Sequence, residues 1–95
     1  MTYVLPLPPL VGSRKRAEAL CAEIPDDANT VRVDVRQLVA YTDTFADELV
    51  QQITVQRGLT LRMYEHRDDL TKAFRTAIIN RATTAGTQHM IEVYR

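Results

Sequence analysis

The chain has little of what builds cross-linked, phosphate-cradling or membrane-spanning proteins. Its 95 residues include one cysteine, Cys21, so no intrachain disulfide can form, which fits a reducing cytosol. The three glycines lie far apart in the chain, and this excludes a glycine-rich phosphate loop. The longest apolar run, YVLPLPPLV at residues 3–11, is interrupted by prolines and is far too short to span a membrane. We therefore expect a soluble cytoplasmic protein without membrane association.

Net charge is lacking as well, because Lys and Arg together number 12 and Asp and Glu together number 12. A zero balance argues against nucleic acid as a partner bound by phosphate neutralisation, although a local basic patch stays open. A net charge of zero also lowers solubility and promotes self-association, so a homodimer is one oligomeric state that the sequence allows. The composition, with 45% hydrophobic and 25% charged residues, is that of an ordinary globular protein, and the length predicts a single domain over residues 1–95.

The first half of the chain alternates between strand and helix patterns. TYVL near the N-terminus is compatible with a short strand, which the following prolines limit to a sheet edge or an early end. Residues 13–24 predict a helix with Ser13 as its N-cap and Pro25 as its stop. TVRVDVR at residues 30–36 alternates valines with charged side chains, which predicts a strand with one covered and one solvated face.

The second half continues this alternation. Residues 44–57 predict a second helix, because Phe45, Leu49 and Ile53 recur every fourth residue before Gly58. The remaining elements are a strand, a third helix and a last strand, which we expect at residues 59–64, 67–85 and 88–95. Alternating strands and helices are typical of an α/β fold with at least some parallel pairing.

The polarity of the strands refines this fold class. A sheet covered on both faces should have continuously apolar strands, whereas these strands alternate. We therefore expect a two-layer sandwich, with a mixed β-sheet of about four strands and three helices on one face. The other face would be open and would carry mixed charges, for which solvation is the usual role and dimerisation a second one. Its charged residues are Arg32, Asp34, Arg36, Arg62 and Glu92.

No set of side chains typical of catalysis or metal binding is visible. His66 and His89 lack neighbouring Cys or carboxylate residues at metal-ligand spacing. Cys21 lies on the apolar stripe of the first predicted helix, which indicates an inert buried thiol. No Ser-His-Asp or Cys-His set can be assigned. We therefore expect a non-enzymatic protein that needs no cofactor and no metal.

The stretch YTDTFADEL at residues 41–49 carries the main candidate site, because its hydroxyl and acidic groups open the second helix. Thr44 is a candidate N-cap in a Thr-x-x-Asp pattern, and Thr42 or Asp43 could take that role instead. A phosphate on Thr44 is the functional alternative, since a helix N-terminus tolerates negative charge. With Asp43, Asp47 and Glu48 nearby, the added charge would repel a docked partner. These two roles are compatible and both stay open.

The same residues resemble the STAS-like domain, a family of small bacterial relatives of the anti-sigma-factor antagonists. The similarity covers about residues 12–64 and is carried by SRKRAEAL, VRVDVRQL and TDTFADEL. Asp34 stands at the family's strand-end position, and Asp43 and Thr44 stand where the antagonists carry an Asp followed by a phosphorylatable Ser or Thr. Phe45 and Ala46 follow, as in STAS-like proteins. The resemblance implies a regulatory module of bacterial or phage origin with Thr44 as its switch.

The sequence thus favours a protein-interaction module that binds a protein partner, such as a kinase-type anti-sigma factor, through the loop before the second helix. The contacts would come from Thr42, Asp43, Asp47 and Glu48, with the last two as exposed side chains of the helix. One alternative is a small homo-oligomeric assembly protein that associates through its open sheet face or its apolar N-terminal arm. Another is a small enzyme or nucleotide binder that uses the start of the second helix as an anion site.

Overall fold

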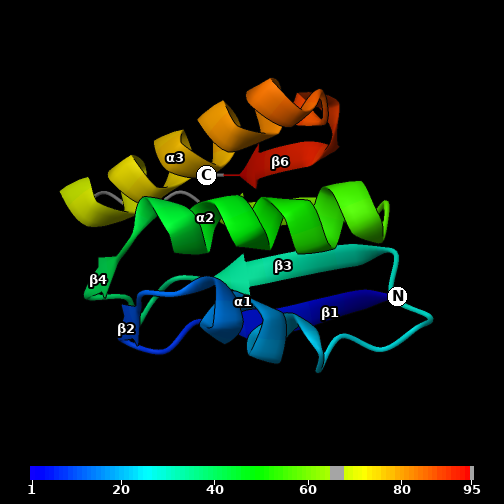
Figure 1. Cartoon of the computed structure of the whole chain (residues 1–95), viewed down its shortest axis with the longest axis horizontal. Helices are drawn as coiled ribbons and strands as arrows, with labels where there is room; N and C mark the ends of the chain where they lie inside the picture. Colours follow the sequence, from blue (N-terminus) through cyan, green and yellow to red (C-terminus); the bar gives the residue numbers. More distant parts are fainter. Residues whose placement is uncertain (65–67, 95) are drawn as a thin grey trace.

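The computed structural model describes residues 1–64 and 68–94, which form a four-stranded sheet with helices on one face (Figure 1). The strands lie in the order β1-β3-β5-β6, so each strand lies beside the preceding strand of the same sheet. β1 is at an edge and ends at Pro6, a place where a proline is tolerated. The strand bounds are β1 (Thr2–Pro6), β3 (Thr30–Asp34), β5 (Thr60–Tyr64) and β6 (Ile91–Tyr94).

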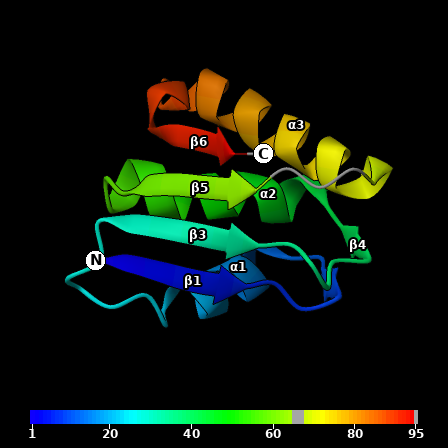
Figure 2. The same cartoon turned by 180° about the vertical axis from the view of Figure 1, so that it is seen from behind.

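Helices connect successive strands of this sheet and pack against a single face, which Figure 2 shows from behind with the strands in front. They are α1 (Arg14–Cys21), α2 (Asp43–Val50) with its π-helical continuation η1 (Gln51–Gln56), and α3 (Asp69–Ala85), which the 3-10 helix η2 (Gln88–Met90) follows. The two-layer α/β sandwich with three helices on one face is confirmed. We expected mixed pairing, and every ladder of the sheet is parallel, because each helical connection returns the chain in the same direction.

A second, two-stranded sheet lies at the carboxyl end of the main sheet (Figure 1). It pairs β2 (Leu10–Val11) in parallel with β4 (Ala40–Tyr41). The carbonyl of Pro9 accepts hydrogen bonds from the amides of Val39 and Ala40 at 2.7 and 3.0 Å. We call Pro9–Val11 and Val39–Tyr41 the β2–β4 corner. Its second segment, residues 39–41, directly precedes the N-cap of α2 in the chain.

The alternation of the strands places the core as the sequence predicted. Val31 and Val33 of β3 and Leu61 and Met63 of β5 are buried under the helices, and the residues between them face the open side. α2 and η1 lie at the centre of the helical layer, between α1 and α3 (Figure 1). Their fully buried side chains include Phe45, Leu49 and Ile53, the residues that recur every fourth position. Burial of these side chains is the main stabilising term of such a fold.

The ends of the helices follow local capping chemistry. The Ser13 hydroxyl accepts a hydrogen bond from the Arg16 amide at 3.1 Å, which confirms the predicted N-cap. α1 ends at Cys21, earlier than predicted, and a turn from Ile24 N to Cys21 O then carries Ile24 into the core. Gly86 closes α3 in the left-handed region at φ 78°, which favours glycine. Within the described residues, no helix has both the length and the apolar composition needed to cross a membrane.

Candidate functional site

The loop before α2 consists of residues 39–42, and the β2–β4 corner fixes its position. The backbone amide of Thr42 donates to the Val11 carbonyl at 3.2 Å, which extends the pairing of β2 and β4 up to the start of the helix. The ring of Tyr41 packs edge-on against Phe74 of α3, with 5.0 Å between centroids and 77° between planes. Phe74 is fully buried, so the corner is attached to the core through this contact.

Thr42, rather than Thr44, is the N-cap of α2. It has extended backbone angles, and its hydroxyl accepts a hydrogen bond from the Phe45 amide at 3.2 Å. The sequence left three residues open as the N-cap. The assignment to Thr42 is confirmed, and the assignment to Thr44 is wrong. The helix starts at Asp43, because a helix that begins there places Phe45 and Ala46 on the side that faces the core. Asp43 is thus in the first turn, where its charge suits the helix dipole.

Thr44 lies inside the first turn of α2 with an exposed side chain. Its hydroxyl shares a 3.0 Å hydrogen bond with the hydroxyl of Thr42. Among the described residues, no backbone group of α2 forms a hydrogen bond with the Thr44 hydroxyl. A modification of Thr44 would therefore leave the cap in place.

Asp47 and Glu48 are engaged within the protein. Nη1 of Arg14, on α1, is 2.7 Å from Oδ2 of Asp47 and 3.3 Å from Oε1 of Glu48. The hydrogen bonds that Arg14 donates to Asp47 and, second, to Glu48 raise the pKa of Arg14 above its ordinary value. The carboxylate side chains are only 19% and 12% exposed, so the expectation that they project as exposed contacts is wrong. They join α1 to α2 instead.

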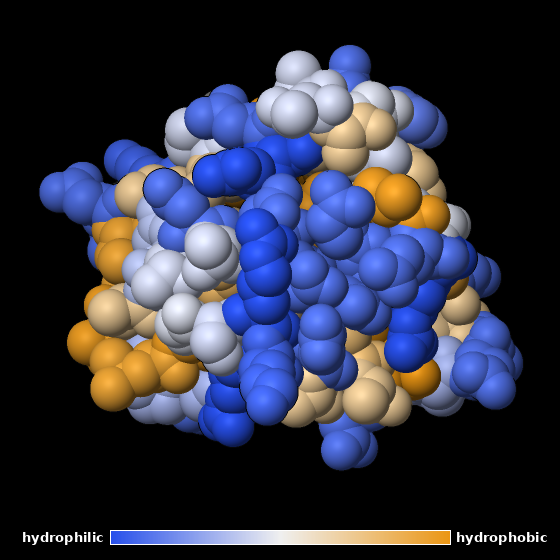
Figure 3. All heavy atoms as spheres, viewed as in Figure 1, coloured by the Kyte–Doolittle hydropathy of each residue, from blue (hydrophilic) through white to orange (hydrophobic). Residues whose placement is uncertain are grey.

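Exposed apolar side chains gather at the β2–β4 corner. Leu10 is 68% exposed and Val39 is 64% exposed, the highest values among the large hydrophobic residues that the structure describes as exposed. Figure 3 shows hydrophobic surface at the left of the view, over the end of the molecule where Figure 1 places β2 and β4. Leu10 is in β2, and Val39 directly precedes β4, the strand with which β2 pairs, so both exposed side chains lie at this corner. We call these two side chains the apolar patch. This patch adjoins Thr42, Asp43 and Thr44 in the chain.

The other side of the loop faces α3 across a hollow of about 290 Å³. Asp43 lines it from α2, and Asn80, Arg81 and Thr84 line it from α3. The loop before α2 is thus bordered by the apolar patch on one side and by polar groups, including the cation of Arg81, on the other. Such a mixed border, apolar in part and polar in part, is typical of protein-binding surfaces.

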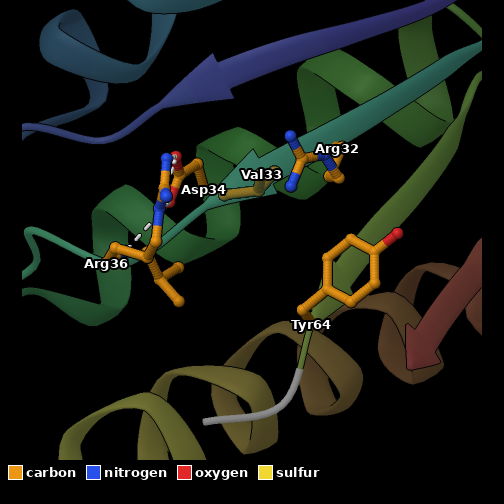
Figure 4. Close-up of a pocket in the computed structure, with 6 residues that line it drawn as sticks. Arg32, Val33, Asp34, Arg36 and Tyr64 are labelled. Carbon is orange, nitrogen blue, oxygen red and sulfur yellow. Dashed lines mark hydrogen bonds and ion pairs between the residues drawn. The ribbon is translucent and has the colours of Figure 1, made fainter. Parts of the chain in front are cut away.

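A smaller hollow of about 170 Å³ lies on the open face of the sheet, at the carboxyl end of β3 (Figure 4). Arg32 and Tyr64 border one side of it, and Asp34 and Arg36 border the other. Arg36 binds both carboxylate oxygens of Asp34 at 2.8–3.1 Å, and this holds the pKa of Asp34 below its ordinary value. The carboxyl end of a parallel sheet is where α/β proteins bind ligands.

The described residues offer no metal site, since no group of three or more His, Cys, Asp or Glu side chains is placed to hold an ion. Cys21 is buried as predicted, and desolvation raises the pKa of its thiol to about 11. His66 is outside the described residues, and His89 is in η2. The thiol is therefore a core group and a poor nucleophile at neutral pH.

Two features were missed by sequence reasoning. The β2–β4 corner consists of two-residue strands, which are too short for any alternation to be read, although PPLV already placed Leu10 among prolines. The aromatic residues of the open face, Tyr64 and Tyr94, share the polar phase of LTLRMY and IEVY, and that signal could have found them.

No protein family, curated protein or solved structure matches this chain. The function of the chain is therefore inferred from its own residues and their geometry.

Proposed function

We propose that the protein is a non-enzymatic regulatory module that docks a protein partner through the β2–β4 corner and the loop before α2. The observation that carries this proposal is the exposure of Leu10 and Val39, at 68% and 64%, near the first turn of α2, which carries the accessible side chain of Thr44. Apolar anchors next to a polar border are the usual anatomy of a protein interface. A rigid support favours affinity, because little ordering is needed on binding.

The resemblance of VRVDVRQL and TDTFADEL to STAS-like domains supports a regulatory role for this loop. A kinase-type anti-sigma factor in a bacterial or phage-derived system is the partner class that the resemblance suggests. Thr42 and Asp43 would contact the partner beside the apolar patch. Asp47 and Glu48 would contribute indirectly, because their pairing with Arg14 fixes the position of α2.

Thr44 would be the switch in this proposal. Its hydroxyl is accessible and is not the helix cap, so a phosphate there adds about −1.5 to −2 charges without removing a capping bond. The N-terminus of α2 tolerates that charge through its dipole. The neighbouring Asp43 would add to the negative potential at the edge of the apolar patch. A partner that buries Leu10 and Val39 would then have to desolvate the phosphate, and the cost of that desolvation would release the partner.

The test is a pull-down from host lysate with tagged protein, in which retained proteins are identified by mass spectrometry. Thr44→Ala should retain the same partner as the wild type, and Thr44→Glu should lose it. Thr2→Glu is the matched control, because Thr2 is exposed at the start of β1, whereas the corner lies at the carboxyl end of the sheet (Figure 1). Leu10→Asp should also lose the partner, whereas Val55→Asp, at an exposed valine of η1, should not. Equal capture by all five variants would contradict docking at the corner.

A homo-oligomeric assembly protein is the second candidate. The observation in its favour is the same exposed apolar pair, together with Val4, Tyr64 and Tyr94 on the open face. Light scattering separates the two proposals. A stable oligomer that Leu10→Asp dissociates, with no other protein captured, would favour assembly.

A further inference from the structure

Two arginines and two tyrosines form a stepped layer on the open face of the sheet. The guanidinium of Arg32 lies over the ring of Tyr64, 5.3 Å from its centroid, and that of Arg62 lies over the ring of Tyr94 at 5.1 Å. Arg32 is in register with Arg62, and Tyr64 is in register with Tyr94. The same diagonal step therefore occurs twice, from β3 to β5 and from β5 to β6. We call these four residues the Arg–Tyr layer.

The layer is ordered before any ligand arrives. The two tyrosine rings lie 5.9 Å apart at 38°, and each is about two-fifths exposed. Arg62 Nε donates to Oε1 of Glu92 at 3.0 Å, and the Tyr94 hydroxyl donates to the same oxygen at 3.2 Å. Glu92 thus fixes both the guanidinium and the ring at this step. Pre-set aromatic surfaces lose little side-chain entropy when a flat ligand stacks on them.

Among the described residues of this face, the two carboxylates are paired and one arginine has no ion pair. The carboxylates of Asp34 and Glu92 are paired with Arg36 and Arg62. Arg32 has no ion pair among the described residues, and it borders the hollow of about 170 Å³ (Figure 4). Its planar guanidinium, stacked on Tyr64, keeps its N–H edge for an oxyanion. A phosphate group is of a size and charge that this hollow accepts.

We propose that the open face binds a single-stranded nucleic acid, with bases stacked on Tyr64 and Tyr94 and a backbone phosphate on Arg32. Aromatic side chains on a sheet, together with arginine, bind single strands with little sequence preference. The zero net charge opposes binding driven by many phosphate contacts, whereas base stacking needs few of them. Two rings on neighbouring strands, rather than one ring in a closed pocket, favour a chain over a single nucleotide.

The test uses fluorescence anisotropy with a labelled single-stranded oligonucleotide of about ten nucleotides. Tyr94→Ala should weaken binding roughly 5-fold to 150-fold, the range for removing one stacking ring. Tyr94→Phe keeps the ring and should bind within about threefold of the wild type. Arg32→Ala should also weaken binding, and Arg16→Ala, at an exposed arginine of α1 on the helical side, should not. Far-UV circular dichroism confirms that each variant is folded.

The salt dependence distinguishes stacking from unspecific charge attraction. With one phosphate contact, the logarithm of the association constant should fall with the logarithm of salt concentration at a slope of about −0.7. A slope steeper than about −3, or equal binding by wild type and Tyr94→Ala, would overturn the proposal. AMP that binds as tightly as the oligonucleotide would overturn it in favour of a mononucleotide site. A dimer in light scattering that Tyr94→Ala dissociates, without oligonucleotide binding, would assign the face to self-association.

Discussion

Replacing Thr42 by alanine tests the assignment of the α2 cap. The substitution removes the side-chain oxygen that accepts the Phe45 amide, and Thr42 is exposed, so little packing is lost with it. Loss of a threonine N-cap costs about 1 kcal/mol and at most about 2 kcal/mol. For a domain of this size, that corresponds to a fall of roughly 4–8 °C in Tm for each kcal/mol. Thr44→Ala should change the free energy of unfolding by less than about 0.5 kcal/mol, because the exposed Thr44 hydroxyl caps no backbone group.

Urea unfolding followed by circular dichroism measures both free energies under one set of conditions. Thr42→Ser is the matched control, since serine keeps the capping oxygen and should stay close to the wild type. A cost for Thr44→Ala equal to that of Thr42→Ala would refute the assignment, and so would a Thr42→Ser variant as unstable as Thr42→Ala. The first outcome would make Thr44 a structural residue and would weaken its case as a switch.

Two further predictions concern titrating groups. The folded pKa of Asp34 is held below its unfolded value of about 3.9 by Arg36, so this pairing stabilises the fold above that pH and the contribution is lost as pH falls through the folded pKa. Arg36→Ala should therefore move the acid midpoint of unfolding to higher pH and should differ little from the wild type at the lowest pH, as measured by circular dichroism in a pH series. Cys21, with its pKa raised to about 11, should react with iodoacetamide at pH 8 far more slowly in the native protein than in urea, and equal rates would contradict its burial.

The layers of the fold could be predicted from the sequence because each strand carries its own record of burial. Val31, Val33, Leu61 and Met63 alternate with polar residues, and this period alone fixes which face the helices cover. The fully parallel pairing was less visible. It depends on each connection containing a helix that returns the chain across the sheet, which is a property of the whole chain rather than of one strand.

The candidate site was predicted less completely, for reasons that individual residues show. Thr42, Asp43 and Thr44 can all cap a helix, and the choice among them is decided by the burial of Phe45 in the core. The ion pair between Arg14 and Asp47 joins residues 33 positions apart, so no local sequence pattern predicts it. The β2–β4 corner likewise depends on pairing between distant two-residue segments.

The two proposed surfaces lie on different layers of the molecule, and this makes their functions separable. Thr44 belongs to α2 on the helical side of the sheet, and the strands that carry the Arg–Tyr layer are uncovered on their other face (Figures 1 and 2). We expect a phosphate on Thr44 to act on a partner at the corner and to leave stacking at Tyr94 unchanged, because Tyr94 is on the open side of β6. β3 ends at Asp34 beside the hollow, and the chain then runs on to the corner, so regulation of one surface by the other would require a movement of β3. The buried side chains of Val31 and Val33 oppose such a movement.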